Sequence, residues 1–381
     1  MKKKICYLVY DEQLWSPLIS RQVIELLQVI KSREPGTGIN LLFVFPWIWY
    51  LRHRKKLKRI AASLRSSEIK LRCYPVFYPF PLPQPFPVKS SAGKWTIPEA
   101  FSGKAFWLLS AMVFPLLLAK RMQGYRLFHC RSYRAASLVL AAGKILSSIK
   151  LIFDPRSDYP DENRLHSGWT PTSRPYIFWK KKERLLLQKA ACTICISDEH
   201  FTDLQREHGA FSYRVIPNNV NCDNFLFNAA ARSKGRRGLS IGPDQVVLCY
   251  LGSMQAQYWH QPDIYVKAIS HLIKVDPNMV FLFLLPPNSA DLLVASLTEA
   301  GITPDRYRIV FPKYEEVGSW LSAADYGTLF LKHRKPVYGT KTIEYLSAGL
   351  RVIVNDNVKA AASLVTCNSG LGLIMNLALG E

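Results

Sequence analysis

The stretch YGTLFLKHRKPVYGTKTIEYLSAGLRVIV, residues 326–354, decides the fold. Its apolar ends predict buried strands over residues 326–331 and 351–354, with a polar loop over 332–339 after the first of them. Thr340 is a good N-cap, so a helix is expected to begin there. A strand, a helix and a strand in this order form one unit of a parallel α/β sheet.

The start of this helix has the chemistry of an anion site. Free N–H groups and the helix dipole favour negative charge at a helix N-terminus, and Lys341 adds a full positive charge beside them. Glu344 follows one turn later and is able to accept hydrogen bonds from a ribose diol. The spacing therefore fits a phosphate clamp and a sugar acceptor at one helix end, although an ordinary surface helix explains it too.

The same alternation of apolar runs and helical patterns extends outward through the chain. In the first half the expected strands are residues 5–9, 40–45, 71–76, 127–130, 151–153, 193–196 and 213–216, with helices over 20–32 and 135–147. In the second half they are residues 246–251, 280–285, 308–311, 326–331 and 351–354, with helices starting near Pro262, Ala290, Glu315 and Thr340. Such alternation indicates parallel sheets covered by helices on both faces.

The length of the chain predicts more than one domain. A chain of 381 residues is too long for one compact core. The segment PNNVN, residues 217–221, suits a sharp reversal because asparagine tolerates a left-handed backbone. We therefore expect domains over residues 1–220 and 221–381.

The positive charge is concentrated in the first half. Residues 1–222 contain 35 Lys and Arg against 15 Asp and Glu, a net charge of +20, whereas residues 223–381 carry only +2. The densest clusters are RHRKKLKR at residues 52–59 and KKK at 180–182. Such a field attracts anionic lipid surfaces, phosphorylated substrates or nucleic acid. No nucleic-acid-binding motif is recognisable, so a nucleic-acid partner is not expected.

Other features favour a cytoplasmic protein. The apolar run at residues 5–10 is too short for a signal peptide and is read as a strand. Eight scattered cysteines fit a reducing compartment. The longest apolar run, residues 105–119, is shorter than the ~20 residues of a bilayer span and contains Pro115. It is read as a buried helix or a helix lying in the membrane interface.

One proline-rich stretch interrupts the pattern. Residues 74–88 contain six prolines interleaved with aromatic side chains, which excludes a helix and favours an extended backbone. It is either a surface loop or an aromatic lip beside an acceptor site or a membrane.

The segment KTIEYLSAGLRVI, residues 341–353, resembles the donor-site signature of retaining glycosyltransferases of family four, which have the GT-B fold. Further segments resemble that family in the same order along the chain. They are SPLISRQV (16–23), FDPRS (153–157), DE (161–162), WKKKE (179–183), IS (196–197), IPNNV (216–220), YLGS (250–253) and ADYG (324–327).

The resemblance implies α/β GT-B architecture, that is, two Rossmann-like domains with parallel sheets facing a central cleft. It implies a nucleotide-diphosphate sugar on the C-terminal domain and an acceptor on the basic N-terminal one. It also implies retention of the anomeric configuration and neither a cofactor nor a metal. The absence of any D-x-D motif agrees with the expectation of no metal.

The donor-site residues expected from the resemblance are Gly252, Ser253, Thr340, Lys341 and Glu344. Positive groups there would stabilise the diphosphate as it leaves with growing negative charge. Lys341 and the helix start at Thr340 are the first candidates for this role, and Glu344 would position the ribose. The missing side chain of Gly252 would let the backbone approach the diphosphate.

The first domain supplies the expected acceptor-side or catalytic residues. Arg131 and Arg156, each at a strand end, would bind an anionic acceptor, while Ser20 and Gln22 belong to the first strand-to-helix loop. His129 is read as a core histidine with a satisfied hydrogen bond.

Three positions depart from the family pattern. Pro336 stands where many members have a glutamate, and the loop over residues 253–260 lacks the usual Arg and Lys. Arg334 or Lys335 would then assist Lys341. Only 27 residues follow Val354, so the crossing helix usual in the family is expected to be truncated or absent.

Together these features predict a metal-independent, retaining hexosyltransferase. It would move sugar to a saccharide acceptor, expected to be lipid-linked, in surface polysaccharide or glycolipid synthesis. The basic first domain places it at an anionic membrane surface, on the inner face of the plasma membrane. The alternative is a catalytically inactive GT-B-like binding or scaffold subunit, which the departures at Pro336 and after Gly252 favour.

Overall fold

The structure is a computed structural model that describes residues 3–16, 19–76, 88–89, 95–96, 104–146, 148–254 and 259–377. The chain divides into two compact units. The first domain consists of Met1–Ile196 and Phe201–Ile216, and the second consists of Ser197–His200 and Pro217–Glu381. The main change of domain falls at the start of the PNNVN segment.

The first domain contains a seven-stranded parallel sheet in the order β3-β2-β1-β6-β7-β8-β9. Its strands are β1 (Lys4–Tyr10), β2 (Gly38–Pro46), β3 (Lys70–Val76), β6 (Leu127–Arg131), β7 (Lys150–Asp154), β8 (Cys192–Cys195) and β9 (Tyr213–Val215). The helices are η1 (Ser20–Glu25), α2 (Leu26–Arg33), α3 (Trp47–Ser66), α4 (Lys104–Met122), α5 (Ser132–Gly143), α6 (Tyr159–His166), α7 (Arg174–Lys189) and α8 (Asp198–His208). All seven expected strands are confirmed. A two-stranded pair, β4 (Val88–Lys89) and β5 (Trp95–Thr96), was not expected.

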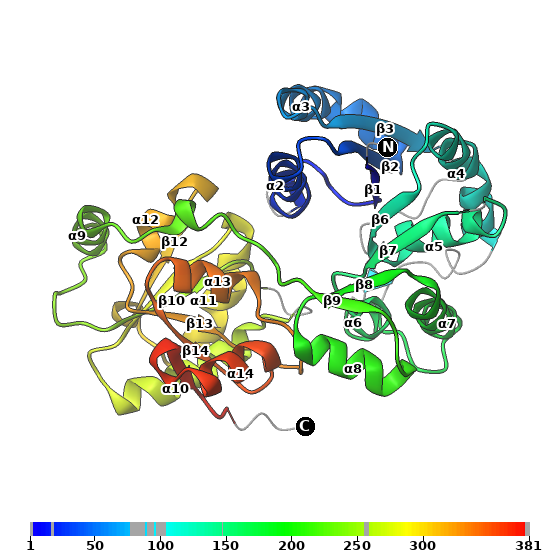
Figure 1. Cartoon of the computed structure of the whole chain (residues 1–381). Coiled ribbons are helices and arrows are strands. Elements are labelled where there is room, and N and C mark those ends of the chain that lie inside the picture. Colours follow the sequence, from blue (N-terminus) through cyan, green and yellow to red (C-terminus); the bar gives the residue numbers. More distant parts are fainter. Residues whose placement is uncertain are drawn as a thin grey trace. The chain divides into compact units, whose positions relative to one another are not determined.

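Alternation along β1 produces two cores, one on each face of this sheet. Tyr7 and Val9 are buried against η1, α2 and α3, whereas Leu8 and Tyr10 are buried with residues of α4, α5 and α7. Successive side chains of a strand point to opposite faces, which is why one strand serves both cores. Figure 1 shows α2 and α3 on one side of the sheet and α4 and α5 on the other.

The second domain contains a six-stranded parallel sheet in the order β12-β11-β10-β13-β14-β15. Its strands are β10 (Val247–Leu251), β11 (Val280–Leu284), β12 (Tyr307–Val310), β13 (Tyr326–Leu329), β14 (Arg351–Val354) and β15 (Gly372–Ile374). Its helices of five or more residues, besides the first residues of α8, are α9 (Ala229–Gly238), α10 (Pro262–Val275), α11 (Ala290–Glu299), α12 (Val317–Leu321), α13 (Thr340–Ser347) and α14 (Lys359–Cys367). The five expected strands are confirmed; the short edge strand β15 was not expected.

The KTIEYLSAG segment packs against its own sheet through one tyrosine. Tyr345 on α13 is fully buried, and its hydroxyl accepts a hydrogen bond of 2.8 Å from the backbone N–H of Leu251 at the end of β10. A Cβ at Gly327 on β13 would overlap the Tyr345 ring. The glycine therefore lets the ring lie directly on the strand, and this contact fixes α13 beside the end of β10.

Both sheets reverse their strand order at one point. The reversal lies between β1 and β6 in the first domain and between β10 and β13 in the second. In open parallel sheets, ligands bind outside the carboxyl ends of the strands at such a point. The expected α/β architecture with two parallel-sheet domains is confirmed, and each domain has one place where a site is expected.

The apolar run around Pro115 forms most of α4, whose middle is partly buried in the first-domain core. Among the described residues, no helix combines the length and apolar character needed to cross a membrane. Residues 77–87, the middle of the proline-rich stretch, lie outside the described residues, as do Pro17 and Leu18 of the first loop.

Candidate functional site

The site in the second domain forms around Lys341, where β10 and α13 meet. Gly252 follows β10 with a φ of 125°, a backbone conformation that favours glycine. A Cβ at this position would lie 2.5 Å from Cε of Lys341. The missing side chain of Gly252 therefore makes room for Lys341, a role that the sequence had not indicated.

The Lys341 side chain contacts two residues of neighbouring elements. Its Nζ lies 2.8 Å from Nε2 of His260, just before α10, and 5.6 Å from the ring centroid of Tyr250 on β10. The ammonium is thus held between an imidazole nitrogen and the face of an aromatic ring. His260 was not among the expected site residues.

The charges around Lys341 are unbalanced. Burial and the positive charge of Lys335 lower the pKa of the Lys341 ammonium to about 8. The negative charge of Glu344 acts in the opposite direction. Burial and the charges of Lys341 and Lys335 hold the pKa of His260 well below its usual range. Lys341 and Lys335 therefore lie near each other and beside a neutral imidazole, with Glu344 as the carboxylate that acts on Lys341, an arrangement that an anion would stabilise.

Thr340 is not the N-cap of α13, contrary to the sequence-based expectation. The cap is Gly339, with a φ of 75°, and Thr340 is the first residue of the helix. A side chain at position 339 would come within 2.7 Å of Cδ2 of Leu329, so the tight turn onto the helix requires glycine.

The remaining donor-site candidates lie close to this centre in the fold. Glu344 is 5% exposed and its charge acts on Lys341. Ser253 is exposed, and its carbonyl accepts a 2.8 Å hydrogen bond from the hydroxyl of Tyr250. Residues 255–258 of the loop after Gly252 lie outside the described residues.

Pro336 is buried and contributes no charged group to its surroundings. Its carbonyl accepts a 2.7 Å hydrogen bond from the Ser197 hydroxyl, which also accepts a bond from the backbone N–H of His200. No carboxylate therefore comes from this position. The neighbouring Lys335 places its ammonium 4.1 Å from the ring centroid of Trp259 and close enough to affect Lys341.

In the first domain, the structure brings Arg131 and Gln22 together. The Arg131 Nε donates to Glu12 and its Nη2 donates to Gln22, each over 2.7 Å. Arg131 is 4% exposed, while its Nη1 has no hydrogen-bond partner within the described residues. Two of its donor groups are thus held by the protein at the β1–β6 reversal, and one remains for another acceptor.

Arg156 lies beside Asp154 at the end of β7. Its φ is 63°, its Nη1 lies 3.6 Å from Asp154, and its buried Nε and Nη2 have no partner among the described residues. Burial alone would raise the pKa of Asp154, but the charge of Arg156 and the hydrogen bond from His129 lower it. The partner of His129 is as expected for a core histidine. Ser20 begins η1 and is half-buried.

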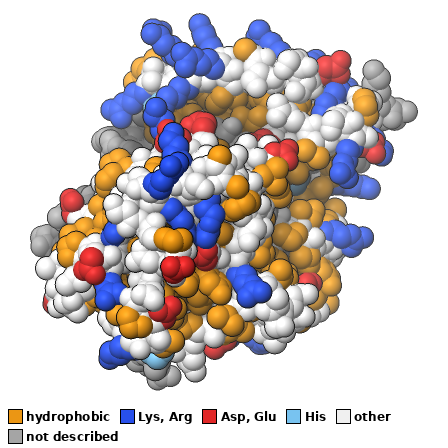
Figure 2. Space-filling model, turned by 90° about the vertical axis from the view of Figure 1, so that its left-hand side faces the viewer, with side chains coloured by type: hydrophobic (Ala, Val, Ile, Leu, Met, Phe, Trp, Pro, Cys, Tyr) orange, Lys and Arg blue, Asp and Glu red, His pale blue; other side chains and the backbone are white. Residues whose placement is uncertain are grey.

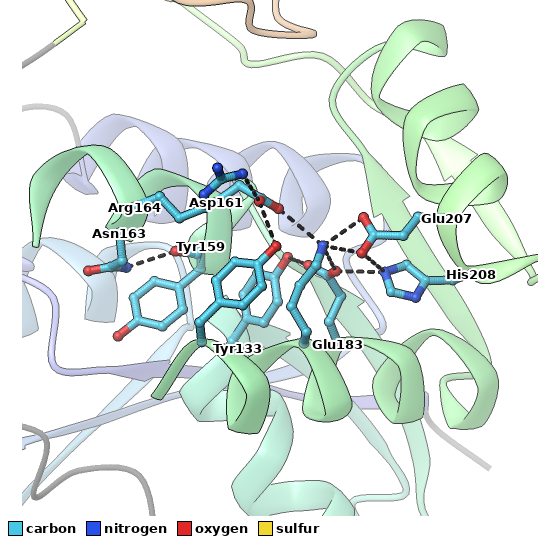
Figure 3. A network of polar contacts seen from close by, with 10 residues as sticks. Tyr133, Tyr159, Asp161, Asn163, Arg164, Glu183, Glu207 and His208 are labelled. Atoms are coloured by element: carbon cyan, nitrogen blue, oxygen red, sulfur yellow. Dashed lines mark hydrogen bonds and ion pairs between the residues drawn. The ribbon is translucent and has the colours of Figure 1, made fainter. Parts of the chain in front are cut away.

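A second polar cluster in the first domain is a self-contained ionic network (Figure 3). The Lys180 Nζ donates to Asp161, Glu183 and Glu207 over 3.1, 2.8 and 2.6 Å. Glu183 also accepts hydrogen bonds from Tyr133 and, over 2.6 Å, from His208.

The geometry of this network bears on metal binding and on the role of Lys180. Glu183, Glu207 and His208 lie close enough together to hold a metal ion. The Lys180 ammonium already binds both carboxylates, and the cluster ties α5, α6, α7 and α8 together. Lys180 itself, part of the KKK cluster, is consequently committed inside the domain.

Comparison with known proteins finds a family resemblance over part of the chain and a fold for the whole chain. The family model described as Glycosyltransferase Family 4 matches residues 76–224. No curated protein sequence matches the chain.

Several solved structures match nearly the whole chain. Sucrose-phosphate synthase from Thermosynechococcus elongatus is 15% identical with a TM-score of 0.64, covering 100% of this chain and 86% of its own. HepE from Anabaena is 14% identical with a TM-score of 0.64, covering 98% and 86%. A glycosyltransferase from Rickettsia africae is 14% identical with a TM-score of 0.65, covering 99% and 85%. Residues 76–224 therefore resemble glycosyltransferase family 4, and the chain as a whole has the GT-B fold of these solved structures.

Proposed function

We propose that this protein is a retaining glycosyltransferase that takes a hexose from a nucleotide-diphosphate sugar bound to its second domain. The observation that carries the proposal is the gathering of Lys335, His260 and Glu344 around Lys341, at the strand-order reversal of that domain. A diphosphate supplies the negative charge that this group of side chains lacks. As the diphosphate leaves, the same charges stabilise its growing negative charge.

The solved structures of similar fold support a nucleotide-sugar donor. HepE has been solved in complex with UDP, with UDP and glucose, and with UDP-glucose. WaaG is described as a glycosyltransferase of lipopolysaccharide biosynthesis. The donor site proposed here needs no metal, because Lys341 and its neighbours supply the positive charge that a metal ion supplies elsewhere.

We place the acceptor on the first domain, at Arg131 and Arg156. Both arginines have buried N–H groups without a partner among the described residues, at the carboxyl ends of adjacent strands. Guanidinium groups bind carboxylate and phosphate groups by paired hydrogen bonds. The acceptor is therefore a saccharide that carries an anionic group, such as the diphosphate of a lipid-linked sugar in surface polysaccharide or glycolipid synthesis.

The competing proposal is a GT-B-like scaffold subunit without catalysis. Pro336 favours it, because it stands where many members of the family that the chain resembles have a glutamate, and its carbonyl accepts a hydrogen bond from Ser197. A turnover assay separates the two proposals. UDP-, GDP- and ADP-sugars are each incubated with lipid-linked acceptors, and the release of free nucleotide is measured.

Glu344 provides a residue-level test of the donor site. Glu344→Gln keeps the shape of the buried side chain but removes its charge, so its hydrogen bonds to a ribose become weaker. Bonds to charged groups contribute ~1.5–3 kcal/mol, so we expect the donor KM to rise by about 10- to 100-fold. Glu299→Gln, at the end of α11, is the control and should leave KM unchanged. Equal donor KM values for the two variants would remove Glu344 from the site.

We also propose that the first domain binds an anionic membrane surface through α3, which would place the enzyme at the inner face of the plasma membrane. Seven Lys and Arg side chains lie on α3, all are exposed, and the helix contains no acidic residue. Within the described residues, no carboxylate pairs with any of them. Figure 2 shows basic side chains gathered at the top of the view, the level at which α3 lies in Figure 1.

Apolar side chains at the start of α3 favour a lipid partner over nucleic acid. Trp47, Tyr50 and Leu51 are 39%, 40% and 55% exposed. Aromatic residues beside lysines and arginines are typical of helices that lie in a membrane interface.

Vesicle binding tests this surface. Lys55→Gln combined with Lys56→Gln should weaken binding to vesicles of phosphatidylcholine and phosphatidylglycerol by about 10-fold or more, since each lysine near such a surface contributes ~1 kcal/mol. Lys234→Gln combined with Lys274→Gln removes the same charge from the second domain and should have little effect. Wild-type protein that bound neutral and anionic vesicles equally would contradict the proposal.

A further inference from the structure

We propose that His260 is a positioning residue for Lys341, and that binding of a nucleoside diphosphate to the second domain drives a proton from solvent onto Lys341. The inference rests on the proposed function, because it assigns a proton to the same donor site. It concerns the side chains of His260, just before α10, and Lys341, on α13, whose nearest nitrogens lie 2.8 Å apart.

The first step is the protonation of His260. Removal of the half-buried imidazole from water, together with the positive charges of Lys341 and Lys335, holds the pKa of His260 well below its usual range. The imidazole is therefore neutral at physiological pH. A neutral imidazole has one acceptor nitrogen, and in this geometry the nitrogen next to the Lys341 amine, Nε2, takes that role.

The second step is the confinement of Lys341. Gly252 lies so close that a Cβ there would stand 2.5 Å from Cε of the lysine, and the ring of Tyr250 lies on another side. The hydrogen bond to His260 therefore fixes the end of a side chain that has little room to move. Holding the amine in one place reduces the entropy that a ligand must remove.

The third step is the charge of Lys341 before and after binding. The groups that act on it are Glu344 on its own helix, Lys335 in the preceding loop, His260 before α10 and Tyr250 on β10. With a pKa of about 8, the free lysine is about half-protonated at pH 8. A dianionic phosphate beside it favours the ammonium, so binding raises the pKa and a proton is taken up.

The sign of the pH dependence follows. Below pH 7 the lysine is charged in both the free and the bound protein, so binding is accompanied by little proton uptake. Above pH 8 the free lysine is mostly neutral, so binding must include protonation and becomes weaker. Affinity for a fully ionised diphosphate should thus fall by roughly tenfold between pH 7 and pH 9.

Calorimetry of UDP binding to the full-length protein measures this proton directly. Titrations at pH 8 in HEPES and in Tris differ in buffer ionisation enthalpy, and the difference in heat gives the number of protons taken up. UDP has lost its second phosphate proton at this pH, since such protons dissociate near pH 6. We expect uptake of about half a proton, and GDP and ADP are titrated in the same way.

Variants separate the two residues. Lys341→Arg keeps a permanent charge and should bind with no proton uptake. His260→Gln retains an acceptor and should keep the uptake, whereas His260→Leu removes the acceptor and should weaken UDP binding at pH 8 several-fold while increasing the uptake. His271→Gln, on the exposed face of α10, is the matched control. Thermal unfolding of each variant checks that it is folded.

The outcomes distinguish this inference from the proposed function. If none of the three diphosphates binds, the proposed donor site itself is wrong. If one binds without proton uptake, the donor site stands and the inference about Lys341 fails. If folded His260→Leu and His260→Gln both match wild type in affinity and uptake, His260 does not position Lys341.

Discussion

Replacing Lys341 by methionine should reduce kcat/KM for sugar transfer by roughly 100- to 1,000-fold, the range expected when one preorganised charge-stabilising group is lost. Methionine preserves the length and apolar part of the side chain, so the close packing against Gly252 remains. What disappears is the positive charge next to the leaving diphosphate. Steady-state kinetics with the donor identified in the turnover panel measures the effect.

The control for this variant is Lys274→Met, which removes an exposed lysine of α10. It should leave kcat/KM within about twofold of wild type. A Lys341→Met enzyme that turned over as fast as Lys274→Met would mean that the diphosphate is stabilised elsewhere. Because the lysine is buried and confined, thermal unfolding should be measured for both variants before the kinetics are compared.

The second large effect concerns stability. Lys180→Met should destabilise the first domain by ~3–5 kcal/mol, because removing one partner of a buried ionic network leaves uncompensated charge. Lys180 is the common partner of Asp161, Glu183 and Glu207, and Glu183 is fully buried. Urea unfolding followed by circular dichroism gives the free energy of unfolding. Lys181→Met, the exposed neighbour, should change it by less than ~0.5 kcal/mol.

The pH dependence provides a second readout of the same network. Burial alone would raise the pKa of Glu183, but hydrogen bonds from His208 and Lys180 lower it below its usual value. In the wild type, its contribution to stability is therefore present above the unfolded pKa and is lost as pH falls through the folded one. Without Lys180 the carboxylates would bind protons more readily. The difference in free energy of unfolding between wild type and Lys180→Met should therefore shrink as the pH falls from 8 to 5. A deficit independent of pH would show that lost packing, not charge, is responsible.

The strands were predictable because buried parallel strands are short, continuous apolar runs. Residues 280–285 and 351–354 have this pattern, and β11 and β14 lie within or match those ranges. The edge strand β15 was missed because its sequence, GLI, is too short to form a pattern. The cap of α13 was predicted one residue too late, because a threonine is the usual capping signal while a glycine is required here by a tertiary contact with Leu329.

The candidate site was predictable only in part. Lys341 and Glu344 belong to a recognisable segment, whereas His260 lies 81 residues from Lys341 and meets it through the order of the strands. A histidine between Trp259 and Gln261 has no local signal for such a contact. The contacts of Lys180 with Asp161 and Glu207, on two other helices, are equally non-local, and only Glu183 lies near it in the sequence.

For directed evolution, Gly327 and Tyr345 behave as one position. Any residue larger than glycine at 327 meets the tyrosine ring, and any smaller ring at 345 leaves a void above β13 and frees the N–H of Leu251. A library that varies position 327 alone should return glycine in nearly every folded clone. Varying both codons together allows combinations such as alanine at 327 with leucine at 345. During evolution, substitutions at positions 327 and 345 are therefore expected to occur together.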